Sequence, residues 1–113
     1  MCSPVWSNVA SGSTLEVEVE VTGGATVVGT VLVVDANGEA TQSVEPIDHF
    51  PLSRPVEAGA SYRVTVHAAS TGSPGVAVVT SQVTGDSRGP DTCRLVTDAQ
   101  HPAAIDIITV FGA

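Results

Sequence analysis

Apolar and polar residues alternate along several stretches of this 113-residue chain. The clearest stretch is TLEVEVEV (14–21), where leucine and valine take every second position and Glu16, Glu18 and Glu20 lie between them. A period of two is typical of a β-strand that buries one face and exposes the other. The stretch SYRVTVHA (61–68) repeats the pattern and predicts a second such strand. Its expected inward positions are Tyr62, Val64, Val66 and Ala68.

Two other stretches are apolar on both faces, ATVVGTVLVVD (25–35) and AIDIITVFG (104–112). A strand of this kind is either covered on both sides or leaves an apolar surface exposed. We therefore expect either that neighbouring loops cover the second face or that this face is an interaction surface. Gly29 interrupts the first stretch, which indicates a bulge or the close approach of another chain segment.

Turn-forming residues divide the rest of the chain. Asn37-Gly38 is a pair favoured in tight hairpin turns with positive φ. The segment 46–55 holds three prolines, which lack the amide hydrogen that a sheet needs, so it is expected to be a loop or an irregular crossing between sheets. Further strands are expected at 39–45, 76–84 and 92–97, with breaks at 22–24, 70–75, 85–91 and 98–102.

These patterns predict an all-β protein of seven to eight strands, with no helix and no internal repeat. Turn signals recur every 8 to 12 residues or so, as in a β-sandwich. Residues 14–113 are therefore expected to form a single antiparallel Greek-key β-sandwich, and residues 1–13 an N-terminal lead segment.

One tyrosine has the setting of a structural corner. Val56 is an apolar anchor, Gly59 suits a turn, and Tyr62 begins an alternating strand. In Greek-key sandwiches such a tyrosine turns its hydroxyl back to the main chain a few residues upstream. With this motif, residues 52–70 resemble immunoglobulin-like and fibronectin type III-like domains, and the strand count extends the resemblance over most of the chain. The resemblance implies an immunoglobulin-like fold and no particular function. In fibronectin-type domains a core tryptophan lies on an early strand, whereas Trp6 lies in the lead.

A second resemblance rests on VEVEVTG, VVDANGEATQSV, FPLSRPV and CRLVTD. These stretches look like the ectodomain of the small mycobacterial membrane proteins that accompany lipid transporters. Members of that family have a membrane-anchor helix and usually two cysteines in the C-terminal half. This sequence departs from the family in both respects.

The charge balance excludes one class of partner. The chain has four arginines, no lysine and twelve acidic residues, for a net charge of −8. Nucleic acid is therefore not an expected partner, because binding a phosphate backbone requires clustered lysine and arginine. No apolar run reaches the roughly 18 to 20 residues of a membrane span. The N-terminus lacks the pattern of a secretory signal. Either the protein starts natively at Met1, or Met1 replaces a removed leader and Cys2 was the first mature residue, as in bacterial lipoproteins.

The row of Glu16, Glu18 and Glu20 has several readings. Alternate residues of a strand lie about 6.8 Å apart on one face, and an opposing row containing Arg63 could offset their repulsion. The row is either a solvated face that discourages edge aggregation, a docking surface for a basic partner, or a calcium site. Calcium needs six to eight converging oxygens, which a straight strand does not supply. The loop acids Asp86 and Asp91 are a second, equally weak set.

Few residues are candidates for chemistry. Cys2 and Cys93 have no metal-binding spacing, which leaves a disulfide between them, a buried Cys93, or a lipid-attachment site at Cys2. A metal site would need the histidines to converge with an acid such as Asp48, and they are far apart in the sequence. The histidines are His49, His67 and His101. No GxSxG motif or catalytic cysteine context is present. No enzyme activity and no cofactor are expected.

The sequence favours a binding or assembly module. The leading hypothesis is an accessory structural subunit of a phage particle, such as a capsid decoration or tail protein, which acts by self-association or by binding a protein partner. It predicts free thiols or a retained Met1, together with symmetric self-association or lattice binding. The alternative is an extracytoplasmic envelope or lipoprotein domain of an actinobacterium, and it predicts a Cys2–Cys93 disulfide or a modified Cys2.

Overall fold

A computed structural model describes residues 2–113, which fold into seven β-strands and one turn of 3-10 helix. The expectation of an all-β protein is confirmed. No helix in this part of the chain is long and apolar enough to cross a membrane. The elements are β1 (Val5–Val9), β2 (Thr14–Val34), β3 (Ala40–Pro46), η1 (Ile47–His49), β4 (Leu52–Pro55), β5 (Ser61–Thr84), β6 (Asp91–Thr97) and β7 (Ala103–Gly112).

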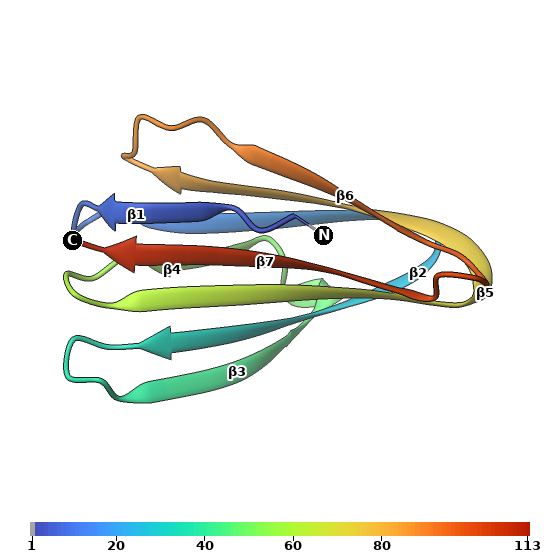
Figure 1. Cartoon of the computed structure of the whole chain (residues 1–113), viewed down its shortest axis with the longest axis horizontal. Coiled ribbons are helices and arrows are strands. Elements are labelled where there is room, and N and C mark those ends of the chain that lie inside the picture. The colour runs from blue at the N-terminus through green and yellow to red at the C-terminus, as the bar shows by residue number, and fades with distance from the viewer. Residues whose placement is uncertain (1) are drawn as a thin grey trace.

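Two very long strands, β2 and β5, form the centre of the sheet (Figure 1). They pair antiparallel from Thr14 with Thr84 to Val34 with Ser61, except at the bend, where Gly24 of β2 and residues 71–74 of β5 have no register partner. The breaks expected at 22–24 and 70–75 are therefore bends inside continuous strands. Glycine permits the bend, because Gly23 has a φ of +74° and a Cβ on Gly75 would collide with the backbone of Ala25.

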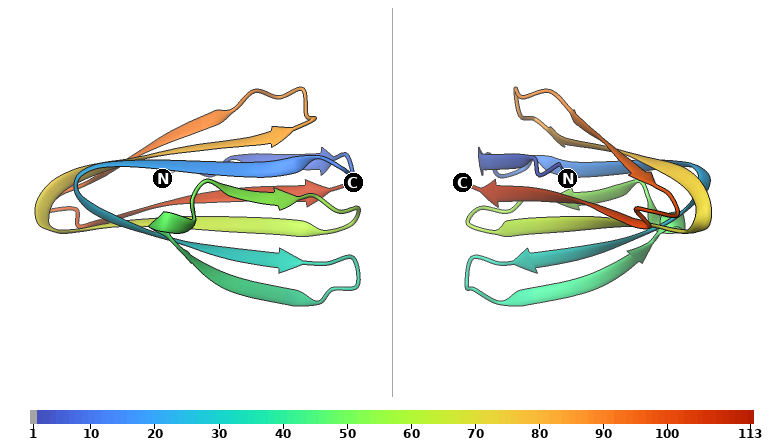
Figure 2. Two further views of the ribbon diagram at one scale, coloured as in Figure 1. Left: turned by 180° about the vertical axis from the view of Figure 1, so that it is seen from behind. Right: turned by 45° about the vertical axis from the view of Figure 1, so that its right-hand side comes forward.

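The bends fold the sheet back on itself and make two layers (Figure 2). The first layer contains β4, the first half of β2, the second half of β5, and β6. The second layer contains β3, the second half of β2, the first half of β5, β7 and β1. The strand β1 runs parallel to β7, so the sheet is mixed and the expected purely antiparallel arrangement is not what forms.

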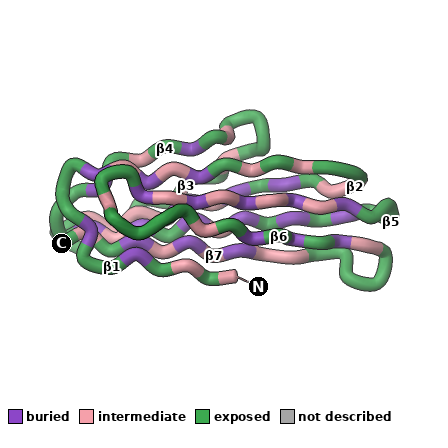
Figure 3. Tube along the Cα trace, turned by 90° about the horizontal axis from the view of Figure 1, so that it is seen from above, coloured by how far each residue is buried: buried purple, intermediate pink, exposed green. Residues whose placement is uncertain are grey.

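The core lies between the two layers, and buried and exposed residues alternate along the strands (Figure 3). Tyr62, Val64, Val66 and Ala68 are all buried, as the alternation predicts. Each fully buried valine contributes roughly 1.5 to 3 kcal/mol relative to an exposed one. Trp6 is 3% exposed and belongs to the same core, so the lead segment supplies a strand and a core side chain.

The connections differ from expectation in detail. At the hairpin between β2 and β3 only Gly38 has a positive φ, and the Asp35 carboxylate accepts hydrogen bonds of 2.9 Å from the amides of Asn37 and Glu39. The crossing after β3 contains η1 and a cis Phe50–Pro51 bond. Its last part pairs with β2 as the short strand β4.

Only glycine fits at position 29, because the ring of Phe50 lies against the backbone there. A Cβ at this position would lie 2.7 Å from the ring of Phe50, which comes from the proline-rich crossing. The close approach predicted for this glycine is therefore made by an aromatic side chain rather than by a neighbouring strand.

Candidate functional site

Tyr62 holds the corner between the end of β4 and the start of β5. Its hydroxyl accepts a hydrogen bond of 3.0 Å from the amide of Glu57, five residues upstream, and its ring is buried. Val56 is buried beside it, and Gly59 has a φ of +75°. The three residues proposed from sequence as a structural corner lie together, and they position the chain rather than a ligand.

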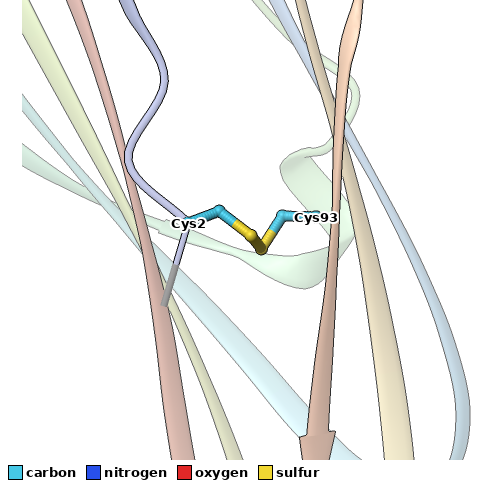
Figure 4. The surroundings of a disulfide bond; sticks show 2 residues. All are labelled: Cys2 and Cys93. Carbon is cyan, nitrogen blue, oxygen red and sulfur yellow. A yellow bond between two sulfur atoms is a disulfide. The ribbon is translucent and has the colours of Figure 1, made fainter.

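Cys2 and Cys93 form a disulfide with a Cα–Cα distance of 5.9 Å (Figure 4). The bond joins the segment before β1 to β6 and therefore ties the second layer to the first. The two cysteines are separated by 91 positions in the sequence, so the bond closes a loop of most of the chain. In the chain-entropy account a loop of this length stabilises the fold by about 4 to 5 kcal/mol. Neither cysteine is free.

The disulfide has a buried carboxylate beside it. Asp106 of β7 is 1% exposed, and its carboxylate and both sulfurs lie within 4.8 Å of one another. Neither carboxylate oxygen has a hydrogen-bond partner within standard distance and angle limits among residues 2–113. The amide of Ile107 donates to the carbonyl of Cys2, at 3.3 Å, and its proximity to Asp106 lowers the pKa of that carboxyl, against the larger effect of burial. Because the sulfurs are bonded to each other, neither offers a thiolate to a metal ion in this state.

Burial raises the pKa of Asp106 to about 6, and the negative charge of Asp91 on β6 adds to the rise. A buried carboxyl without a partner is costly and calls for a physical explanation. Sequence reasoning missed this residue. The signal was present, since Asp106 takes an inward position between Ala104 and Ile108 in an alternating strand.

The glutamate row lies on the outer face of the first layer. Glu16 accepts a hydrogen bond of 2.9 Å from Gln82, while Glu18 and Glu20 are exposed. A hollow of about 250 Å³ beside these two is lined by Phe50, Pro51 and Val78 among others. The carboxylates of the row do not converge on one point, so the structure does not support a calcium site there.

The expectation that Arg63 opposes the glutamate row is wrong. Arg63 pairs with Leu32 and Thr109 in the second layer, because β5 passes through both layers and residues 61–70 lie in the other half of the sheet. The residues that oppose Glu18 and Glu20 on β5 are Thr80 and Val78.

The histidines do not converge. His49 contacts Glu45 at 3.1 Å, His101 lies 3.6 Å from Asp98, and His67 is exposed on the outer face of the second layer. Asp86 is held by Arg88 at 2.6 Å, which lowers the pKa of Asp86 to about 2. Among residues 2–113, the one group of three potential metal ligands is the disulfide with Asp106.

The outer face of the second layer is apolar. Valine, leucine, isoleucine and phenylalanine lie on this face along β1, β2, β3 and β7, while the central strand β5 presents Ser61, Arg63, Thr65, His67 and Ala69 between them. Val44 is 65% exposed, Phe111 46% and Val28 42%. We call this surface the apolar face; its members are Val5, Val28, Leu32, Val34, Val44, Ile105, Ile107 and Phe111.

The charge of the apolar face is opposite to that of the whole chain. Its central strand, β5, presents Arg63 and His67 there, and no strand residue in register with them is acidic. The chain as a whole carries a net charge of −8. The sequence left open whether loops cover the second face of the doubly apolar strands. Loops do not cover it fully, because four of its members are exposed: Val5, Val28, Val44 and Phe111.

The chain has no significant match among protein-family models, curated proteins or solved structures.

Proposed function

We propose that this protein is a non-enzymatic binding module that works outside the cytoplasm and docks a partner protein on its apolar face. The observation that carries the proposal is the apolar face itself. Exposed large apolar side chains gathered on one face of a sheet are typical of an interaction site. The proposal adopts the envelope-domain alternative in place of the phage-particle hypothesis that leads from sequence.

The chemistry of the apolar face specifies the partner. Arg63, on the central strand of the face, is a fixed positive charge with no acidic strand residue in register. A matching surface is apolar with a carboxylate opposite Arg63, because an arginine buried on binding needs a charged, hydrogen-bonded partner. A second apolar face of the same chain supplies no carboxylate.

The disulfide supports the location. Disulfides persist in oxidising compartments and are rare in the reducing cytoplasm. The Cys2–Cys93 bond joins both layers, so reduction removes a restraint on the whole fold. The envelope alternative predicts this bond or a modified Cys2, whereas the phage-particle hypothesis predicts free thiols or a retained Met1.

The finer fold assignment belongs to the same proposal. Two layers, seven strands and the corner at Tyr62 support an immunoglobulin-like sandwich. The parallel pairing of β1 with β7 departs from a purely antiparallel arrangement.

A second candidate is the accessory subunit of a phage particle. The observation that favours it is the placement of the glutamate row and the apolar face on the outer surfaces of different layers. Copies could therefore stack head to tail, with Arg63 of one copy against Glu18 or Glu20 of the next. A contact of this heterologous kind builds rings or filaments.

Site-specific photo-crosslinking tests the proposal in the native host. A photoreactive amino acid replaces Val44 or Phe111 on the apolar face, and Glu18 in a matched control. The proposal expects one discrete adduct with a different protein from both apolar-face positions and none from Glu18. It also expects Val28→Glu and Arg63→Glu to abolish the adduct.

The other outcomes separate the two candidates. Adducts between copies that link Val44 to the glutamate face would support the particle subunit. An absence of adducts from the apolar face, with wild-type abundance and folding, would overturn docking at this surface.

A further inference from the structure

The surroundings of the disulfide are asymmetric. Cys93 is 1% exposed, whereas Cys2 is only partly buried at the start of the described chain. In the dithiol form Cys2 is therefore the sulfur that a dissolved oxidant reaches first. Cys93 then completes the bond from inside the protein (Figure 4), and a carboxylate oxygen of Asp106 lies within 4.8 Å of both sulfurs.

A thiol in an apolar interior is a poor nucleophile. Only the thiolate attacks a disulfide, and burial disfavours the thiolate. A neighbouring base that removes the proton during the attack avoids forming an isolated buried thiolate. The strand β7 places one carboxylate at this point, and in the disulfide form neither of its oxygens accepts a hydrogen bond from the described part of the chain.

We propose that Asp106 is the proton acceptor for the Cys93 thiol when the Cys2–Cys93 disulfide forms. In the first step Cys2 reacts with a low-molecular-weight disulfide, such as oxidised glutathione, to give a mixed disulfide and one free thiol. In the second step the sulfur of Cys93 attacks the sulfur of Cys2. The bond between Cys2 and the glutathione sulfur breaks, and glutathione leaves as its thiolate. The proton of Cys93 passes to the Asp106 carboxylate and then to solvent.

Burying the Asp106 carboxylate costs free energy of folding, and a purely structural role does not account for this cost. A structural aspartate would accept hydrogen bonds, whereas Asp106 is buried and accepts none within standard limits among residues 2–113. The charge of Asp91 on β6 raises its pKa further, and the Ile107 amide and the charged N-terminus oppose this rise only in part. These surroundings keep its carboxylate basic enough to accept a proton near neutral pH. The same surroundings make it destabilising once the bond has formed. Asp106→Asn should therefore yield a more stable protein that forms its disulfide more slowly.

The test measures the second step alone. Reduced, folded protein is mixed with excess oxidised glutathione, quenched with acid at intervals, and resolved by intact mass into dithiol, mixed-disulfide and closed forms. The rate at which the mixed disulfide closes is followed from pH 5 to 9 for wild type, Asp106→Asn, Asp91→Asn and the exposed-charge control Glu18→Gln. Emission from the buried Trp6 checks that every reduced variant remains folded.

The expected result is a closure rate that rises through pH 6 and then levels off in wild type and in Glu18→Gln. Asp106→Asn should close about tenfold or more slowly near pH 7 and follow only the titration of the thiol. Asp91→Asn should shift the wild-type profile to lower pH. Equal closure rates and profiles in wild type and Asp106→Asn would overturn the proposal. So would a reduced chain that has lost the Trp6 signal, because Asp106 would then have no fixed place beside Cys93.

Discussion

Replacing Asp106 with asparagine should stabilise the oxidised protein at neutral pH, although it replaces a native buried carboxyl group with an amide. The carboxylate at this position is 1% exposed, and neither oxygen has a hydrogen-bond partner within standard limits among residues 2–113. Asparagine has nearly the same shape and carries no charge. The substitution therefore removes the cost of a buried charge without leaving a cavity.

The magnitude follows from the pKa. Burial raises the pKa of Asp106 from 3.8 to about 6 in the folded state. The folded protein thus holds a proton that the unfolded chain releases between these two values, so stability falls as the pH rises through this window. At about 1.4 kcal/mol per pH unit, the loss amounts to about 3 kcal/mol by pH 7. Below pH 3.8 the loss disappears. Asp106→Asn lacks this dependence.

Urea denaturation followed by Trp6 fluorescence, at intervals from pH 4 to 8, measures the effect. The free energy of unfolding of Asp106→Asn minus that of wild type should be near zero at pH 4 and grow to about 3 kcal/mol at pH 7. Ionic contacts such as Asp86 with Arg88 have the opposite pH dependence, but they are common to both proteins and cancel in the difference. A difference that stays constant across this range, or a wild type that gains on the variant as pH rises, would refute the reasoning.

Three further experiments test the fold. Tyr62→Phe removes the hydroxyl that accepts a main-chain hydrogen bond and should lower the free energy of unfolding by about 1 to 2 kcal/mol in urea titration; no change would show that the corner does not depend on the hydroxyl. Gly29→Ala should cost about 1 to 3 kcal/mol through collision with Phe50, and a second change, Phe50→Leu, should recover part of the loss. Replacing both Cys2 and Cys93 with serine should cost about 4 to 5 kcal/mol, and a thermal midpoint equal to wild type would contradict a stabilising bond.

The strand pattern was readable because a period of two directly reflects which face is buried. The inward positions of residues 61–68 follow from alternation alone. The bends at Gly23 and Gly75 were read as strand ends, because glycine signals a turn and a bend in the same way. Whether pairing continues past a glycine depends on the partner strand, which lies dozens of residues away in sequence.

Less of the candidate site could be predicted from the sequence. The pairing of Cys2 with Cys93 depends on the parallel contact of β1 with β7, and no local pattern indicates such a contact. Arg63 was assigned to the wrong surface for a similar reason, since the sequence does not reveal that β5 crosses from one layer to the other. Asp106 is different: a single acid in an inward position was visible, but its meaning depends on the sulfurs that the fold brings beside it.

The continuous pairing of β2 with β5 has a consequence for how the molecule opens. In a sandwich of two separate sheets, one sheet can lose its hydrogen bonds while the other keeps them. Here each layer contains half of the same two-strand ribbon, so opening either layer strains a ribbon that the other layer shares. The slowest-exchanging amides of both layers should therefore report one free energy, that of global unfolding, and the protein should exchange its core as a single cooperative unit.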